Sequence, residues 1–390
     1  MTDDFLARYF AGFDTIPGWF SPDACLMFMA YRQLLADEGL SGDVLEIGVH
    51  HGLSAIGAAA LRGEARTFVA VDLFDDLQTE NVSGSGLGNR EAFLSNMRRF
   101  HDDLSFLRVI TGPSAALRAE ELGNEFSFCH IDGGHSDAEA YADLELCAAI
   151  SKPGGLVALD DYFNPAFPGV GEAAVRFHLD RPGVLRPIAI GFNKALFQRE
   201  PAPFDLNVRF GEVFPTVLSS TAALWGEPAR WFDAAFGAFF DVARSTPRRL
   251  TLAAGPSVGA VIEPSQQLVT ATAGDNIPVS VQVTNLSRFP MAMGVRPFAL
   301  AYHLLTADHQ LLGYDNARQW FTEPLLPGAT RNVIVPVQVP ATPGSYALEF
   351  DVVWEGVTWL RAQGNAAPRI TLDAVPRDTP TAALAIRETS

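Results

Sequence analysis

Short apolar runs alternate with stretches of helical periodicity through the first half of the chain. The apolar runs are DVLEI (43–47), TFVAV (67–71), FLRVIT (106–111), FSFCHI (126–131) and LVALD (156–160). Helical patterns lie near residues 53–62, 90–100, 114–122 and 136–150. Strands that are apolar throughout and separated by helices are typical of a parallel sheet covered on both faces. The pattern predicts a doubly wound, Rossmann-like α/β domain over residues 41–200.

Helix and turn signals extend this prediction at both ends. Residues 1–40 should form a helical segment, because Ser21 suits an N-cap, Pro22 the first helical position and Gly39 the helix end. The stretch PIAIGFNKALFQ (187–198) predicts a hairpin turning at Phe192-Asn193. The parallel sheet should therefore finish in an antiparallel pair.

The spacing of hydrophobic residues along the sequence changes in the second half of the chain. Residues 201–255 are predicted to be a connector, with an amphipathic helix in ARWFDAAFGAFFDV (229–242) that packs on one domain or forms a dimer contact. Beyond it, IPVSVQV, NVIVPVQV and YALEFDVVW alternate with a period of two, and turn signals such as LLPGAT separate them. We predict an immunoglobulin-like β-sandwich over 256–375 and a disordered tail over 376–390.

The composition of the chain limits the classes of molecule that it is expected to bind. The chain has 390 residues, 48% of them hydrophobic, and a net charge of −17. Such an acidic surface argues against nucleic acid and anionic membranes. No apolar run reaches the roughly 20 residues that span a bilayer, and the N-terminus has no signal-peptide core. Three cysteines without zinc spacing predict buried thiols, so we expect a cytoplasmic protein. The only lysines, Lys152 and Lys194, are given no functional weight.

The first strand leads into a nucleotide-type turn. In DVLEIGVHHGLSA, Gly48 and Gly52 would let backbone approach a ligand beyond the carboxyl end of the strand. The dinucleotide pattern G-x-G-x-x-G is absent, and the carboxylate of Glu46 disfavours a pyrophosphate. The second strand ends at Asp72, where an acid can bind ribose hydroxyls. Together these features favour an adenosine-bearing cation, S-adenosylmethionine.

Several motifs resemble one family. LEIGVHHGLSA, VAVDLF, GPS at 112–114, HIDGGHSDAEAYADL and KPGGLVALDDY resemble class I S-adenosylmethionine-dependent methyltransferases, and most of all the methyltransferase domain 24 group and metal-dependent sugar O-methyltransferases. The resemblance covers residues 40–200. It implies that Glu46, Gly48 and Gly52 line the methionine part, Asp72 holds the ribose, Ser114 lies by the adenine and Asp132 closes the pocket. Ser54 is also expected to bind the cofactor.

Three acids should meet beside that pocket. The fourth and fifth strands are neighbours in this fold, so Asp132 should lie close to Asp160 and Asp161. Converging carboxylates repel unless a cation joins them, and Mg²⁺ accepts oxygen ligands of this kind. In the resembling sugar enzymes the same arrangement binds a metal that orients the acceptor. His135 could accept the acceptor's proton, because its ordinary pKa lies near working pH.

Alternatives remain open for these residues. Asp161 could cap a helix or face solvent, and Asp132 could serve the cofactor without a metal. His135 could be a structural residue at the start of the next helix, since this chain departs from the sugar enzymes at Gly134-His135. His50 and His51 fit pocket lining or surface better than metal ligands. The glycine-rich stretch over 71–89 is predicted to be a lid, or else an exposed loop.

The sequence thus predicts an O-methyltransferase for a sugar hydroxyl of a glycan or sugar-containing metabolite, with a possible homo-oligomer. The second half resembles sandwich modules of bacterial polysaccharide-cluster proteins. There Trp320, Trp354 and Trp359 could stack on sugars or pack in the core. A non-catalytic carbohydrate-binding or assembly protein on a methyltransferase-like scaffold is the alternative. Hydroxylation or isomerisation on the same scaffold is a third, since fold alone does not fix the reaction.

Overall fold

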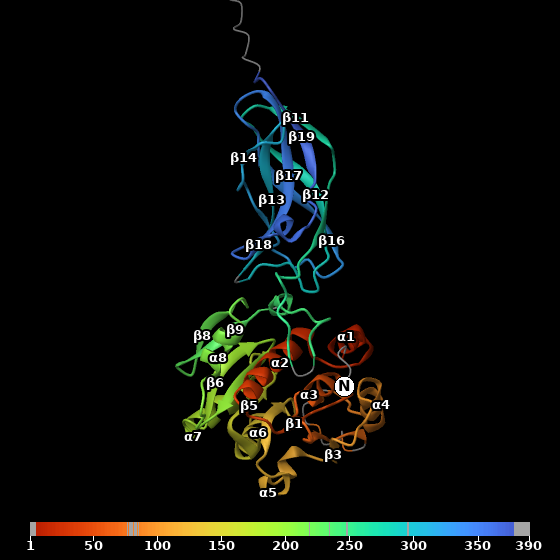
Figure 1. The fold of residues 1–390 in the computed structure, drawn as a ribbon, viewed down its shortest axis with the longest axis vertical. Coiled ribbons are helices and arrows are strands. Elements are labelled where there is room, and N and C mark those ends of the chain that lie inside the picture. Colours follow the sequence, from red (N-terminus) through yellow and green to blue (C-terminus); the bar gives the residue numbers. More distant parts are fainter. Residues whose placement is uncertain are drawn as a thin grey trace, which may run out of the picture. The chain divides into compact units, whose positions relative to one another are not determined.

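A computed structural model describes residues 5–75, 77, 81, 84, 86–217, 219–233, 235–246, 249–294 and 296–377 (Figure 1). The chain divides into two compact units, Met1–Ala254 and Gly255–Ser390. Part of the predicted lid, residues 76, 78–80, 82, 83 and 85, lies outside the described residues, as does the tail from 378. No helix in the described part of the chain is long and apolar enough to cross a membrane.

In its described residues, the first unit is built on one nine-stranded sheet, in the order β3-β2-β1-β4-β5-β7-β6-β9-β8. Its strands are β1 (Asp43–Ile47), β2 (Phe68–Asp72), β3 (Leu107–Thr111), β4 (Phe126–Ile131), β5 (Ser151–Leu159), β6 (Leu185–Gly191), β7 (Lys194–Arg199), β8 (Ser220–Leu224) and β9 (Glu227–Phe232). Strands β1 to β5 are parallel, and β7 runs antiparallel to both β5 and β6. The predicted doubly wound α/β fold with an antiparallel hairpin is confirmed.

Helices surround this sheet (Figure 1). They are α1 (Phe5–Ala11), α2 (Pro22–Asp37), α3 (Leu53–Ala59), α4 (Arg90–Phe100), α5 (Ala119–Leu122), α6 (Asp137–Ile150), α7 (Pro168–Asp180) and α8 (Leu206–Val213). Ser21 caps α2 by accepting a hydrogen bond from the Ala24 amide, as its sequence predicts. The hairpin turns at Phe192 and Asn193, which both have positive φ. Two such residues in succession suit the twist of the flanking strands.

The predicted amphipathic helix over 229–242 is wrong. Its first residues form β9, which pairs with β6 and β8, and only the short 3-10 helix η4 (Phe236–Phe239) follows. The hairpin leaves β6 as an edge with unpaired backbone groups, and a strand satisfies them where a helix would not. The aromatic side chains still pack together, with the Phe232 and Phe236 rings 4.6 Å apart. The stretch predicted as a connector therefore adds strands to the first unit.

The second unit contains only strands and short 3-10 turns among its described residues. The strands are β10 (Ala260–Pro264), β11 (Leu268–Thr272), β12 (Asn276–Asn285), β13 (Phe298–Thr306), β14 (Leu311–Gly313), β15 (Gln319–Trp320), β16 (Thr330–Gln338), β17 (Gly344–Trp354), β18 (Thr358–Trp359) and β19 (Arg369–Val375). They form a three-stranded sheet, β10-β12-β16, and a seven-stranded sheet, β11-β19-β17-β13-β14 with β15 and β18 attached. An immunoglobulin-like classification stays a prediction.

The period-two pattern of this unit has the expected cause. Val333, Val335 and Val337 of β16 are buried, while the residues between them are exposed. Pro336 lies on an edge strand, because β12 is the only described strand that pairs with β16. Trp354 is buried and stacks on Phe298, with ring centroids 5.1 Å apart. This tryptophan belongs to the core and offers no surface to a sugar.

Candidate active site

A cavity of about 990 Å³ opens beyond the carboxyl ends of β1, β2, β4 and β5. Of the site residues expected from sequence, Gly48, Asp72, Ser114, Asp132, His135, Asp160 and Asp161 line it. Glu46, Gly52 and Ser54 are not among its lining residues. His50 lines it as well, stacked on His51 with ring centroids 4.0 Å apart.

The sheet register brings the first residues after the strands to one level. Ile47 of β1 pairs with Ile131 of β4, which pairs with Leu159 of β5. The backbone hydrogen bonds between these strands continue for one residue past the strand ends. The Asp132 amide donates to the Ile47 carbonyl and the Asp160 amide to the Ile131 carbonyl, both at 2.9 Å. Parallel pairing therefore places Asp132 and Asp160 side by side at the cavity.

Gly48 has a positive φ of 85°, and no other residue type fits its place. A Cβ added there would lie 1.8 Å from the carbonyl oxygen of Asp132. The glycine thus permits the close approach of two strand-end loops. Its presence is explained by packing of the protein against itself, whether or not a ligand lies above it.

Asp72 is held rigidly at the end of β2. Its carboxylate accepts hydrogen bonds from the backbone amides of His50 at 2.7 Å and Phe74 at 3.0 Å. These two bonds fix the turn after β1 against the turn after β2. Asp72 also lines the cavity, so its carboxylate is held at a fixed place in the cavity wall.

His135 and Asp161 form an oriented pair. His135 Nε2 lies 3.0 Å from Asp161 Oδ2, and its ring stacks on Phe167 with centroids 3.8 Å apart. The other carboxylate oxygen accepts from Asn164 at 2.8 Å and Asn193 at 2.6 Å. Burial alone would raise the pKa of Asp161, but the hydrogen bonds from His135, Asn164 and Asn193 lower it overall. Asp161 is therefore an anion that holds the imidazole in place.

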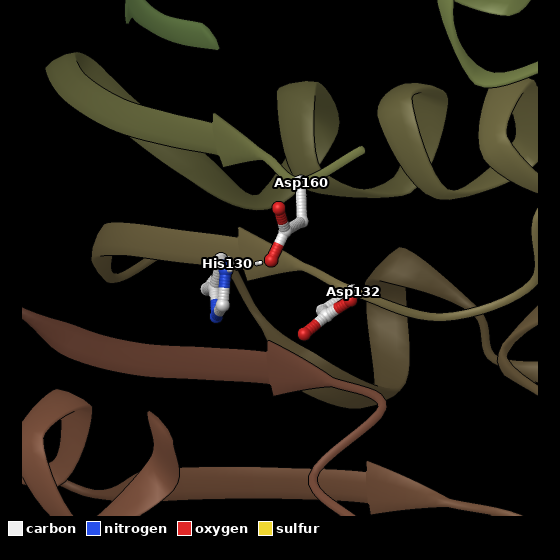
Figure 2. A group of neighbouring side chains, drawn as sticks. All are labelled: His130, Asp132 and Asp160. Carbon is white, nitrogen blue, oxygen red and sulfur yellow. Dashed lines mark ion pairs between the residues drawn. The ribbon is translucent and has the colours of Figure 1, made fainter. Parts of the chain in front are cut away.

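Asp132 and Asp160 lie close to each other and to further charged side chains (Figure 2). The pKa of Asp132 is raised well above its ordinary value, first by removal from water and then by the charge of Asp160. Asp160 is buried and forms an ion pair with Lys194, the first residue of β7. That ammonium lowers the pKa of Asp132 in part. The acids converge as predicted, but a lysine already compensates one of them.

Behind these acids lies a buried histidine that sequence reasoning did not single out. His130 Nδ1 is 2.9 Å from Glu46 Oε1, and both side chains are fully buried. His130 Nε2 is 3.9 Å from Asp160 Oδ2. Glu46 therefore bonds to His130 beneath the cavity floor, which leaves its expected contact with a cofactor untested.

Among the described residues, two overlapping groups could hold a metal ion. We define the inner group as His130, Asp132 and Asp160, and the outer group as Asp132, His135 and Asp161. In each group the candidate ligand atoms lie within 4.8 Å of one another. Asp132 belongs to both. The donor sets of carboxylates and imidazole suit a divalent cation.

Helix α6 supplies a further buried acid, Asp143. Burial raises its pKa to about 7, although a hydrogen bond with Ser114 acts in the opposite direction. Ser114 lines the cavity, so Asp143 supports the cavity wall from inside the domain. No sequence pattern marked Asp143, because its position on α6 resembles any polar residue of an amphipathic helix.

Residues 45–162 match the family model described as a methyltransferase domain. This match supports a methyltransferase. The matched segment runs from β1 to the residue after Asp161, so it contains the strand ends that form the cavity floor. No curated protein matches the chain.

Solved structures resemble about half of the chain. The O-methyltransferase NovP is 18% identical over 46% of this chain and 80% of its own, with a TM-score of 0.37. An O-methyltransferase from Bacillus cereus in complex with SAH is 18% identical over 51% and 91%, with a TM-score of 0.36. CalS11, a TDP-rhamnose 3′-O-methyltransferase, is 19% identical over 50% and 92%, with a TM-score of 0.33. At such low scores these similarities carry no argument about function.

Proposed function

We propose that the chain is an S-adenosylmethionine-dependent O-methyltransferase that acts on a hydroxyl group of a sugar, in a glycan or a sugar-containing metabolite. One observation carries the proposal. The His135–Asp161 pair faces the same cavity as Asp72, at the strand ends of the segment that matches the methyltransferase family. The residues that we propose as proton acceptor and as ribose-binding acid thus line one cavity.

The cavity fits the proposed cofactor. Its volume of about 990 Å³ lies at the upper end of the range for small-molecule sites and leaves room for cofactor and acceptor together. Asp72 is fixed by two backbone amides and can bind the ribose hydroxyls. Ser114 lies on the same wall, where the adenine is expected. S-adenosylmethionine supplies an electrophilic methyl group, which becomes bonded to the acceptor oxygen as the carbon–sulfur bond breaks.

His135 is the group that we propose to take the proton of the acceptor hydroxyl. Its ring is fixed by stacking on Phe167 and by the bond to Asp161. An anionic Asp161 stabilises the imidazolium that forms, much as a carboxylate does in other histidine bases. The alternative role, a structural residue before α6, predicts no effect of His135 on the chemical step.

A divalent cation is part of the proposal, at the outer group. Asp132 and Asp161 would hold it, with His135 beside them, and it would lower the pKa of a nearby acceptor hydroxyl. Asp160 was expected as a third ligand, but Lys194 already pairs with it. The raised pKa of Asp132 fits a carboxylate that gains from a nearby positive charge.

The sugar acceptor is supported by the rim of the cavity. Trp19 lines the cavity and is 76% exposed, and its ring lies 5.5 Å from that of His50. An exposed indole at the mouth of a polar site can stack on the apolar face of a sugar ring. This feature favours a sugar over a small acyclic alcohol, which could not cover the indole.

Cofactor binding tests the proposal directly. Asp72→Ala should weaken S-adenosylhomocysteine binding by roughly tenfold to hundredfold in calorimetry, because hydrogen bonds to a carboxylate are lost. His135→Ala should leave that affinity unchanged, and should slow methyl transfer to a sugar acceptor by ~10²–10⁴. Asp102→Ala, at an exposed site, is the control. Native protein that binds NADH and not S-adenosylhomocysteine would contradict the proposal.

A further inference from the structure

Lys194 is one of only two lysines in the chain, and it is almost fully buried at 2% exposure. It begins β7, directly after the hairpin turn, and its ammonium forms an ion pair with Asp160. The same nitrogen lies 5.2 Å from the centroid of the Phe20 ring. Taking a lysine out of water is costly unless a partner stabilises its charge. The position of Lys194 is therefore specified by the acid cluster.

The inner group has the arrangement of a cation site. The imidazole of His130 is bonded through Nδ1 to Glu46, a pattern that elsewhere orients metal-binding histidines. Its Nε2 atom is buried and has no hydrogen-bond partner among the described residues. That atom faces Asp160 at 3.9 Å, and Figure 2 shows the histidine and both carboxylates close together. A donor set of one nitrogen and two carboxylates suits a divalent transition metal.

We propose that the Lys194 ammonium is the resident cation of the inner group and excludes divalent ions from it. A divalent ion bound to Asp160 would displace the ammonium and leave it buried without its partner. Breaking a buried ion pair in this way costs more free energy than breaking one at the surface. Divalent ions are thereby confined to the outer group, Asp132, His135 and Asp161. Lys194 thus determines where in the cluster a metal binds.

This inference rests on the proposed function only in treating the outer group as the metal site of the enzyme. The role of Lys194 follows from contacts that need no methyl transfer. Its removal should leave His130, Asp132 and Asp160 as an open site that prefers Mn²⁺, Co²⁺ or Zn²⁺ to Mg²⁺, because imidazole is a better ligand for those ions.

The experiment is a metal titration of native protein, Lys194→Met and Lys152→Met. Lys152 is the matched control, because it pairs with Glu125 at 3.0 Å, is more exposed than Lys194, and lies at the opposite end of β5 from Asp160. Lys194→Met should bind Mn²⁺ about tenfold more tightly than native protein or gain a second ion, by calorimetry. With Co²⁺ it should develop visible absorption bands of a nitrogen-containing site. Lys152→Met should behave as native.

Adding Asp160→Asn to Lys194→Met should abolish the gain. Equal Mn²⁺ stoichiometry and affinity in native protein and Lys194→Met would overturn the inference. Binding of S-adenosylhomocysteine, measured on the same samples, reports on the proposed function separately. A protein that fails to bind this cofactor but gains the metal on loss of Lys194 would reject the function and retain the inference.

A second measurement needs no change at Lys194. Native protein labelled with [ε-¹³C]lysine should give two lysine signals, and Lys152→Met identifies the one from Lys194. Saturating Mg²⁺ should leave that signal distinct from its position in Asp160→Asn, in which the ion pair is lost. A shift to the Asp160→Asn position would show that the ion displaces the ammonium, and would overturn the inference even if Lys194→Met did not fold.

Discussion

The buried carboxyl group of Asp143 makes the stability of the folded protein depend on pH. Its folded-state pKa of about 7 lies above its value of 3.8 in an unfolded chain. Below pH 4 both states are protonated, so the group has no effect there. As pH rises from about 4 to 7 the unfolded chain releases the proton first, and the native state loses stability.

Asp143→Asn should remove that loss. The variant is expected to exceed native protein in unfolding free energy by on the order of a few kcal/mol at pH 8. The difference should shrink toward pH 4. Urea unfolding at both pH values measures it, with the exposed Asp102→Asn as the control. A difference that does not depend on pH would mean that Asp143 is ionised in the folded protein.

Helix α6 is the element that places His135 at the cavity. It begins with a capping box, in which the Ser136 hydroxyl accepts from the Glu139 amide at 3.3 Å and the Glu139 carboxylate accepts from the Ser136 amide at 3.2 Å. The box fixes the chain one residue after His135. A fixed helix start therefore holds the imidazole toward Asp161.

Ser136→Ala should cost about 1 kcal/mol of stability, because the first turn of α6 loses a hydrogen-bond acceptor. Thermal or urea unfolding measures this loss. Ser95→Ala, at an exposed position inside α4, is the matched control and should be neutral or slightly stabilising. Equal stabilities of the two variants would show that the capping box contributes nothing measurable to the fold.

At the scale of the whole molecule, the site belongs to one unit. Every residue that lines the cavity falls within Met1–Ala254, and the second unit has its own buried core. A protein of residues 1–254 should therefore fold and bind S-adenosylhomocysteine with native affinity. Calorimetry checks this expectation, and circular dichroism verifies folding. A folded fragment with weakened binding would mean that the second unit contributes to the site.

The sequence by itself determined the main elements over residues 41–200 and the edge of the sheet at which the candidate site residues gather. Strands β1 and β4 have the bounds that the apolar runs predict, because backbone hydrogen bonding and burial impose a local period on side chains. Asp72 ends β2, Asp132 directly follows β4, and Asp160 and Asp161 are the first two residues after β5. Their convergence on one cavity follows from parallel strand order alone.

Only the tertiary structure decided which side chains pair at that edge. Lys194 meets Asp160 because β7 lies antiparallel beside β5, and Glu46 meets His130 because β1 lies beside β4. These partners are 34 and 84 residues apart in the chain. The first residues of the aromatic run at 229–242 likewise form a strand, because the edge of β6 needed a partner. Local periodicity contains no information about residues that become neighbours only through folding. The sequence could therefore place the acids, but not Lys194 and His130, which pair with two of them.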